Sequence, residues 1–341
     1  SIALASSGHL VTHNRIYNSG EHGMYAQCGN SIISNNTVYA NAECGIKVAK
    51  CRNTSVLDNI CHSNQSNLQV QSGFENVLVQ GNNCKGAVLF DLGFTWNTAL
   101  DAFGGRNVKV IGNYFHSEDP PNWSITADGT EGIHIEGNSC KKGLIYTGNA
   151  TPVGYSNVTI RDNEFLTGVI RVVKSQGALI SGNVAQSLHF NDSNSNGILN
   201  DNIFTALTVD TRKDLQVEAF KSICGNKITS TDPSGAPNFE LFNGQEAVVD
   251  RVRICNNEIK TSGALIFNIN TAGGITNSVI SNNTFDAGGS NTISITTNAN
   301  INAIIGNVGL IGTITTTNST AIGNTGGTTF SGAGSSFANN L

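Results

Sequence analysis

The residues best placed to do chemistry in this sequence are two aspartates, Asp91 and Asp128, each of which ends a short predicted strand. If residues 87–91 and 124–128 are strands of neighbouring coils, the two carboxylates face the same way with their backbones about 4.8 Å apart. Carboxyl groups about 5–5.5 Å apart suit retaining glycoside hydrolysis. Like charges this close also raise one pKa, as a general acid requires. The pair predicts a glycoside hydrolase, although an acidic pair on a sheet face can equally be a solvated surface.

Two further acidic residues are candidates for one position of that pair. Inverting glycoside hydrolysis needs carboxyl groups about 6.5–9.5 Å apart, a spacing that a partner on a nearby loop could supply. Asp101 and Glu131 are such partners. The predicted catalytic set is therefore Asp91, Asp128, Asp101 and Glu131.

Long insertions flank these residues and carry aromatic side chains. Residues 92–107 extend one bend and residues 116–124 extend a bend of the next coil, and the two tryptophans, Trp96 and Trp123, fall in these segments. Extra length in a repeat structure goes into loops on one face, often the binding face. Exposed aromatic rings suit the apolar faces of sugars, so the loops predict the walls of a sugar-binding groove. A loop packed down by its own aromatic residues is the alternative.

Polar residues continue along the same predicted face. Counting by two along the third strand of each coil places Arg171, His189 and Asp210 outward, followed by Glu240. We interpret Arg171, His189 and Asp210 as substrate-binding residues on the floor of the groove.

A second constellation lies on the first strand of three successive coils. Lys109 and His134 share one predicted outward column, and Glu136 and Arg161 share the next. A base beside cations is what β-elimination of a uronic acid requires, because the cations stabilise the enolate formed from the carboxylate. The alternative function is therefore a polysaccharide lyase, and a surface cluster of salt bridges is another interpretation. No run of acidic residues with calcium-site spacing accompanies the set.

The elements that must position these residues follow from a repeated asparagine. It has an aliphatic residue three positions before it in most repeats, a small or polar residue directly before it and an apolar residue two positions after it. The steps lie mostly between about 19 and 26 residues, a period that indicates a solenoid. Stacked asparagines at one bend can bond to each other and to backbone, so we interpret them as architectural. They occupy positions 14, 36, 59, 82, 113, 138, 163, 183, 202, 226, 257, 283, 307 and 324.

Three short apolar segments in most repeats have the period of two that indicates strands. Short strands separated by Asn and Gly bends describe one coil of a parallel β-helix, and the helical segment of a leucine-rich repeat does not occur. The sequence predicts an all-β, right-handed, single-stranded parallel β-helix with three short strands per coil and about 14 coils. Residues 1–310 would form this domain, and residues 311–341 would form charge-free terminal coils or a cap.

The outward positions of the first strand are apolar in several coils, and charge disappears after Asp286. Because a monomer normally carries more surface charge, this stripe suggests a side buried by another copy of the chain, with a capping segment as the alternative. The stripe comprises Leu10, Ile32, Leu57, Leu78, Val279, Ile305 and Ile322. The chain starts within a coil and without Met, so we expect it to be part of a longer protein.

The composition disfavours two classes of partner. The net charge is −5, 13% of the residues are charged, and neither a basic run nor a long apolar stretch occurs, which disfavours nucleic-acid binding and membrane insertion. Neither a Gly-rich phosphate loop nor an HExxH or GxSxG motif is present, so we expect neither a cofactor nor a metal.

The eight cysteines follow the repeat. Cys61, Cys84 and Cys140 occupy an inward column that other apolar residues fill elsewhere, and Cys224 and Cys255 share another equivalent position. No CxxC pair occurs. We interpret the cysteines as small buried hydrophobic residues rather than disulfide partners.

At the level of architecture, the chain resembles the bacteriophage tailspike depolymerases. The resemblance rests on the repeat asparagine, the three-strand coils and the charge-poor tail, through segments such as residues 34–38 and 281–285, and it covers nearly the whole sequence. It implies a homotrimer of parallel β-helices on a virion tail, outside the cell, that degrades bacterial capsule or O-antigen. Active sites in that family vary with the glycan, and the fold also houses pectate-lyase-like enzymes. A lyase and a non-catalytic, glycan-binding adhesin therefore remain alternatives.

Overall fold

The structure of the chain is a computed structural model. It describes residues 1–86, 89–95, 105–118, 123–147, 157–173, 175, 177–191, 197–210, 222–230, 238–245, 249–261, 266–271, 275–287, 292–296, 300–309, 312–315, 319–326, 328–331 and 335–341. Every regular element in these ranges is a β-strand. Within the same ranges, no helix is long and apolar enough to cross a membrane. The chain divides into two compact units, Ser1–Ser175 and Gln176–Leu341.

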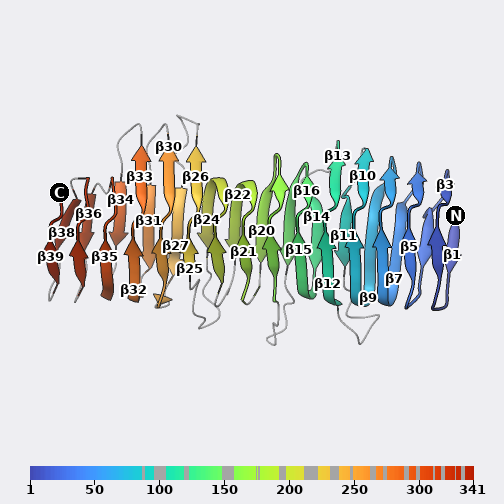
Figure 1. Cartoon of the computed structure of the whole chain (residues 1–341), viewed down its shortest axis with the longest axis horizontal. Helices are drawn as coiled ribbons and strands as arrows, with labels where there is room; N and C mark the ends of the chain where they lie inside the picture. Colours follow the sequence, from blue (N-terminus) through green and yellow to red (C-terminus); the bar gives the residue numbers. More distant parts are fainter. Residues whose placement is uncertain are drawn as a thin grey trace. The chain divides into compact units, whose positions relative to one another are not determined.

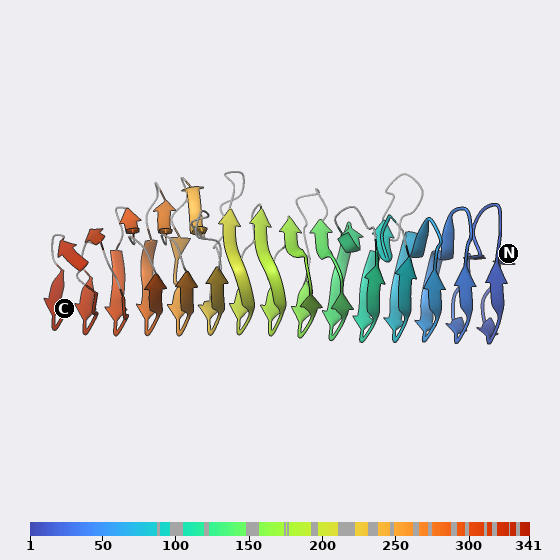
Figure 2. The ribbon, with the colours of Figure 1, turned by 90° about the horizontal axis from the view of Figure 1, so that it is seen from above.

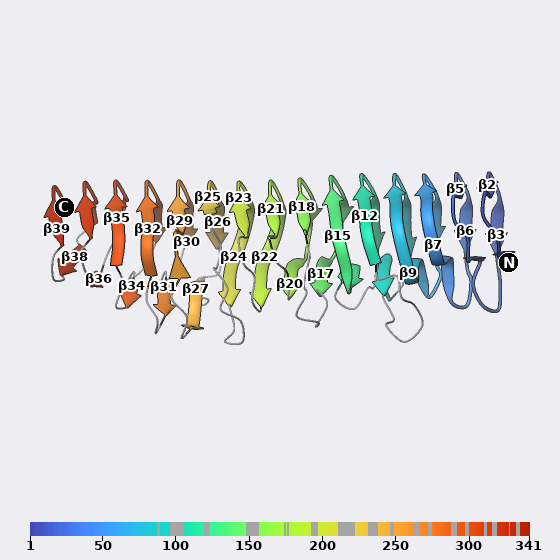
Figure 3. The same ribbon diagram turned by 90° about the horizontal axis from the view of Figure 1, so that it is seen from below.

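In the first unit, each strand pairs in parallel with the equivalent strand of the next coil, and three faces result (Figure 1). The first sheet contains β2 (Leu10–Thr12), β5 (Ile32–Ser34), the ends of β7 (Cys44–Leu57) and β9 (Ser66–Gln80), β12 (Gly105–Ile111), β15 (Thr130–Glu136) and β18 (Thr159–Arg161), which lie side by side in Figure 3. The second sheet contains β3 (Arg15–Tyr17), β6 (Thr37–Tyr39), β8 (Ile60–His62), β10 (Asn83–Gly86), β13 (Tyr114–Ser117), β16 (Ser139–Cys140) and β19 (Glu164–Phe165). The third sheet contains β1 (Ile2–Leu4), β4 (Met24–Ala26), the starts of β7 and β9, β11 (Leu92–Thr95), β14 (Trp123–Asp128), β17 (Gly143–Thr147) and β20 (Val169–Val173).

The second unit repeats this arrangement, and within each unit the coils follow one another in chain order (Figure 2). Its first sheet contains β21 (Leu179–Ser181), β23 (Ile198–Asn200), β25 (Ser222–Cys224), β29 (Arg253–Cys255), β32 (Ile275–Ser281), β35 (Asn300–Ile305), β37 (Thr320–Ile322) and β39 (Ser336–Ala338); β28 (Val249–Asp250) pairs with β32. Its second sheet contains the starts of β22 (Val184–Asn191) and β24 (Ile203–Asp210), then β26 (Lys227–Ser230), β30 (Glu258–Thr261) and β33 (Thr284–Ala287). Its third sheet contains the ends of β22 and β24, then β27 (Asn238–Gln245), β31 (Ile266–Thr271), β34 (Thr292–Thr296), β36 (Gly312–Thr315) and β38 (Thr328–Ser331).

The repeat asparagines form a hydrogen-bonded ladder at the bend between the first and second sheets. Asn82 is typical: its Nδ2 donates to Asn113 Oδ1 at 3.0 Å and to Val56 O at 2.9 Å, and its Oδ1 accepts from Asn59 N and Nδ2 at 3.0 Å. The same side-chain bond links Asn14 through Asn163 in the first unit and Asn183 through Asn340 in the second. The architectural interpretation of these residues is confirmed.

The small or polar residue before each repeat asparagine has a conformational cause. It adopts the left-handed backbone region, for example at Asp58 (φ 53°), Gly81 (φ 66°) and Asn282 (φ 55°). Glycine enters this region without steric cost, and Asn and Asp tolerate it better than other residues. The backbone conformation of the bend therefore favours Gly, Asn or Asp directly before each repeat asparagine.

Apolar columns on both sides of the ladder form the interior. Ile33, three residues before a repeat asparagine, and Val38, two residues after the same asparagine, are fully buried. Cys61 and Cys84 continue the column of Val38 in register, and both are buried. Because packing and register agree with the repeat, the prediction of an all-β parallel β-helix is confirmed.

Two predictions about the fold are wrong. Cys224 and Cys255 form a disulfide with a Cα–Cα distance of 4.6 Å, whereas the other six cysteines are free and buried. Equivalent positions of adjacent parallel strands lie at the Cα–Cα distance of about 4.4–6.8 Å that a disulfide needs, and this makes the bond possible.

The second wrong prediction concerns the coil that contains Asp91. Its third strand is β11 (Leu92–Thr95) and not residues 87–91, so residues 92–95 do not belong to a loop.

Candidate functional site

Asp91 lies inside the coil and not on its surface. Its carboxylate is fully buried, accepts from Asn67 Nδ2 at 3.1 Å and from Ser117 N at 3.5 Å, and receives a short bond from Ser117 Oγ. Burial raises the pKa of Asp91 to about 6, and the hydrogen bonds from Ser117 and Asn67 oppose this rise. The residue ends an interior chain of polar side chains that includes Asn41 and Asn64. The predicted outward orientation of Asp91 is wrong.

Asp91 and Asp128 are not neighbours. Asp91 N donates to Ser124 O at 3.1 Å, and the register pairs Asp128 with Thr95. The two aspartates therefore lie at opposite ends of the paired strands, about 13 Å apart along the strand direction. The predicted carboxylate pair is wrong, because it depended on a strand at residues 87–91.

Among the described members of the predicted catalytic set, Asp128 is the one that reaches the surface of the third sheet. The residue is exposed at the end of β14, next to Thr147 of β17, and desolvation by the neighbouring protein atoms raises the pKa of its carboxyl group. Glu131 lies past the following bend, half-buried on β15 of the first sheet opposite Arg106. Asp101 lies outside the described residues. A catalytic partner for Asp128 stays a prediction.

The predicted binding residues are spread over the two units. Trp123 is half-buried at the start of β14, and Trp96 lies outside the described residues. Arg171 is half-buried in the outward column of the third sheet, and its Nε is buried without a hydrogen-bond partner among the described residues. In the second unit, His189 is exposed in register with Thr208. Their contacts with a substrate stay predictions.

Asp210 does not share the column of His189. The register pairs His189 with Thr208 and Thr208 with Glu240, whereas Asp210 pairs with Asn191, two residues further along the strand. The predicted column is therefore right for His189 and Glu240 and wrong for Asp210.

The four residues of the predicted lyase site on the first sheet lie close together in the structure. Lys109 pairs in register with His134, and Glu136 with Arg161, as the repeat predicts. Glu136 accepts from His134 Nε2 and from Arg161 Nη2, both at 2.6 Å. The hydrogen bonds from His134 and Arg161 hold the pKa of Glu136 below its ordinary value. Lys109 is exposed beside this cluster.

A column of aromatic and cationic side chains on the second sheet escaped the sequence predictions. The column has one member on each of five successive coils, and these members pair in register: Tyr17, Tyr39, His62, Lys85 and His116. The rings of Tyr17 and Tyr39 stack with centroids 5.2 Å apart, and those of Tyr39 and His62 with centroids 4.9 Å apart. We call this set the aromatic column. In the sequence, each member of the column is the third residue after a repeat asparagine.

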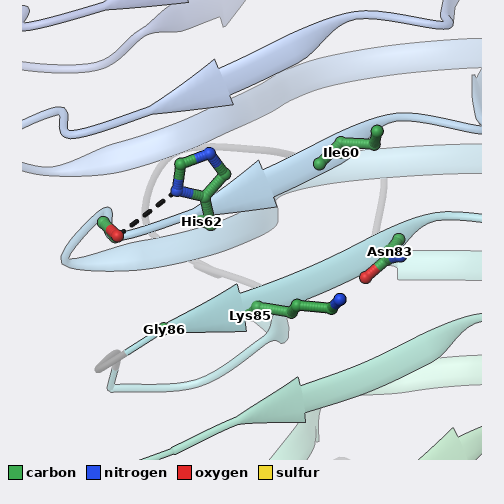
Figure 4. Close-up of a pocket in the computed structure, with 6 residues that line it drawn as sticks. Ile60, His62, Asn83, Lys85 and Gly86 are labelled. Carbon is green, nitrogen blue, oxygen red and sulfur yellow. Dashed lines mark hydrogen bonds between the residues drawn. The ribbon is translucent and has the colours of Figure 1, made fainter.

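Cations flank the aromatic column. Arg15 is exposed, donates from Nε to Tyr39 OH at 3.0 Å and lies 5.3 Å from the centroid of that ring. Lys85 Nζ lies 5.7 Å from the ring centroid of Tyr114. A hollow of about 410 Å³ opens beside Lys85 (Figure 4). It is lined by Ile60, His62, Ser63, Asn83, Lys85 and Gly86.

Among the described residues, no three His, Cys, Asp or Glu side chains are grouped so that they could hold a metal ion.

Comparison with known proteins supports the fold and does not identify an activity. Residues 1–95 match a family model described as a right-handed β-helix region. This region contains the first four members of the aromatic column and the hollow. No curated protein and no solved structure matches the chain at a significant level. Right-handed β-helices are common among carbohydrate-active proteins and adhesins.

Proposed function

We propose that this protein binds a bacterial surface polysaccharide through the second sheet of its first unit. The observation that carries the proposal is the aromatic column, Tyr17, Tyr39, His62, Lys85 and His116, on five successive coils. Tyrosine and histidine rings combine an apolar body with a polar edge, and sugars present both C–H faces and hydroxyl groups. Coils spaced about 4.8 Å apart present these groups repeatedly, as a repetitive polymer requires.

The cations of this surface are available to a ligand. On the first sheet, Glu75 pairs with Arg106 at 2.9 Å and Glu136 pairs with Arg161. Among the described residues, Arg15 and Lys85 contact aromatic rings and form no ion pair with a carboxylate. A ligand that meets Arg15 or Lys85 need not displace a protein carboxylate.

We expect Arg15→Gln to weaken polysaccharide binding at least tenfold, because it removes an exposed guanidinium and the bond that holds Tyr39. The measurement is biolayer interferometry against a panel of bacterial capsules and lipopolysaccharides. Arg171→Gln is the matched control, since it removes one guanidinium from the third sheet. Equal losses in the two variants, or a loss only in Arg171→Gln, would move binding away from the second sheet. Failure of the wild type to bind any member of the panel would refute the proposed function.

A second candidate function is cleavage of the polysaccharide by β-elimination, which the cluster around Glu136 favours. In the neutral tautomer that donates from Nε2 to Glu136, His134 Nδ1 carries a lone pair and can act as a base. In the proposed step, Nδ1 takes the proton beside a uronate carboxylate, the electron pair forms a C=C bond, and the glycosidic C–O bond breaks. The leaving oxygen takes up a proton from water, and Lys109 stabilises the enolate charge. Glycoside hydrolysis has less support, since the predicted aspartate pair is not assembled.

The elimination is tested by the ultraviolet absorbance of its unsaturated product. We expect wild-type protein to produce this absorbance on a uronate-containing polysaccharide and His134→Ala to lose it by at least a hundredfold. Thr159→Ala, which changes the next residue of the same column, should retain it. Fragments released without ultraviolet absorbance would indicate hydrolysis, and no released fragments would indicate a binding protein.

The setting that we propose is that of a tailspike, a homotrimer on the tail of a virion outside the cell. Its support is the resemblance in the repeat and the exposed apolar side chains of the first sheet, of which Leu10 is 67% and Ile32 44% exposed. A monomeric mass in light scattering at micromolar concentration would refute the trimer.

A further inference from the structure

The aromatic column is interrupted after His62. One face of the His62 ring stacks on Tyr39 with an interplanar angle of 9°. On the next coil the column continues with Lys85 instead of a ring, so no further ring of the column stacks on the opposite face of His62. His62 Nδ1 and Ser63 Oγ are 3.3 Å apart, a hydrogen bond that fixes the ring (Figure 4). A flat apolar surface is thus left open at the end of a rigid stack.

Lys85 leaves room beside this ring. Its side chain runs along β10 toward Asn83 in Figure 4, and its Nζ lies 5.7 Å from the Tyr114 centroid. The hollow of about 410 Å³ lies between the His62 and Lys85 strands. Small-ligand sites measure about 300–1,000 Å³, so this hollow has the size of one or two sugar rings.

Two residues that line the hollow, Asn83 and Lys85, carry polar groups without a protein partner among the described residues. Asn83 Oδ1 is buried and has no hydrogen-bond partner among the described residues. A buried acceptor without a partner is unfavourable, so an Asn83 amide that turns toward the hollow gains a hydrogen bond from a ligand hydroxyl. The Lys85 ammonium group forms no ion pair within the described chain, so a ligand carboxylate would meet an uncompensated cation.

We propose that this hollow binds one acidic sugar ring, a hexuronate, of the polysaccharide; the inference rests on the proposed function. The apolar face of the sugar stacks on His62 and continues the column, its carboxylate pairs with Lys85, and a hydroxyl donates to Asn83 Oδ1. The hollow opens to solvent, so the polymer extends from the bound ring in both directions. The site selects for acidic sugars, whereas the rest of the column contributes affinity for the chain.

The test uses two tetrasaccharides of the same shape, tetragalacturonate and neutral galactotetraose, titrated into the full chain and followed by ligand-observed NMR. We expect the wild type to bind tetragalacturonate at least tenfold more tightly. Lys85→Gln should reduce this preference to less than twofold. Lys47→Gln is the matched control, because Lys47 Nζ lies 5.7 Å from the ring centroid of Tyr25 on the third sheet. It should leave the preference intact.

A second variant tests the hollow itself. Lys85→Tyr places a ring where the column lacks one, as Tyr39 does two coils earlier, so the fold accommodates it while the hollow is filled. We expect tetragalacturonate binding to fall at least tenfold with an unchanged or higher Tm. Wild-type binding without preference, no binding of tetragalacturonate, or equal behaviour of Lys85→Gln and Lys47→Gln would overturn the hollow as an acidic-sugar site. The proposed function would survive these results if the polysaccharide panel still showed binding that Arg15→Gln weakens.

Discussion

Replacing Asn82 with alanine should lower the free energy of unfolding by more than about 3 kcal/mol. Asn82 is fully buried and accepts from Asn59 N and Asn59 Nδ2, both at 3.0 Å. It also donates to Val56 O at 2.9 Å. Alanine would leave these three groups of the preceding coil without this partner in a place that water does not reach, and each unsatisfied buried group costs about 1–3 kcal/mol. Thermal and urea unfolding at one scan rate would measure the loss.

An exposed asparagine of the same first unit provides the control. Asn76 Nδ2 donates to Asn53 Oδ1 at 2.9 Å, but the residue is exposed and has a left-handed backbone (φ 55°). Asn76→Gly keeps this conformation available and removes the side chain where water can replace it, so we expect a loss of less than about 1 kcal/mol. If Asn82→Ala were no more harmful than Asn76→Gly, the ladder would not hold the coils together.

Asp91→Asn should stabilise the protein at pH 7 by up to about 3 kcal/mol, because it removes the cost of burying a charge. Burial raises the pKa of Asp91 from 3.8 to about 6. The folded state therefore binds the proton more tightly than the unfolded chain does. The stability that this group contributes is fully present below about pH 4 and is lost as the pH rises to about 6.

The difference between wild type and Asp91→Asn isolates this carboxyl group from all others. We expect the difference in Tm to be largest at pH 7 and to shrink as the pH falls toward 4. Asp91→Ala should instead destabilise the protein, since the donors Asn67 Nδ2 and Ser117 Oγ lose their acceptor. A Tm difference between wild type and Asp91→Asn that does not change with pH would mean that Asp91 is not a buried titrating group.

The repeat asparagine was sufficient to predict the ladder and the inward columns, because a buried amide and its left-handed neighbour restrict the residue types at each bend. The prediction failed where a coil contains an insertion. Residues 87–91 and residues 92–95 are both apolar enough for a strand. The strand in the structure is 92–95, and Gly93 has no side chain that would mark its position as outward. A period of two cannot choose between such segments, and the resulting error separated Asp91 from its predicted partner.

The surface sites were predictable to different degrees. Lys109 and His134 lie 25 residues apart, as do Glu136 and Arg161, which is the length of one ordinary repeat, so their columns followed directly from the repeat. The disulfide could also have been predicted from the sequence, since Cys224 and Cys255 occupy equivalent positions of adjacent coils.

The hollow could not be predicted from the sequence. The hollow exists because the Lys85 side chain turns toward Tyr114. A side-chain rotamer cannot be deduced from the pattern of residue types in a sequence. The aromatic column itself was readable as the third residue after each repeat asparagine, but the ring stacking that leaves one face of His62 open was not.

A crystal structure of the protein with a fragment of the polysaccharide that it binds is the most direct test of recognition by the second sheet. We predict a sugar ring stacked on His62 with its carboxylate beside Lys85 Nζ, and further sugar units along the aromatic column. Sugar density on the third sheet, beside Asp128 and Arg171, with none near His62, would contradict it.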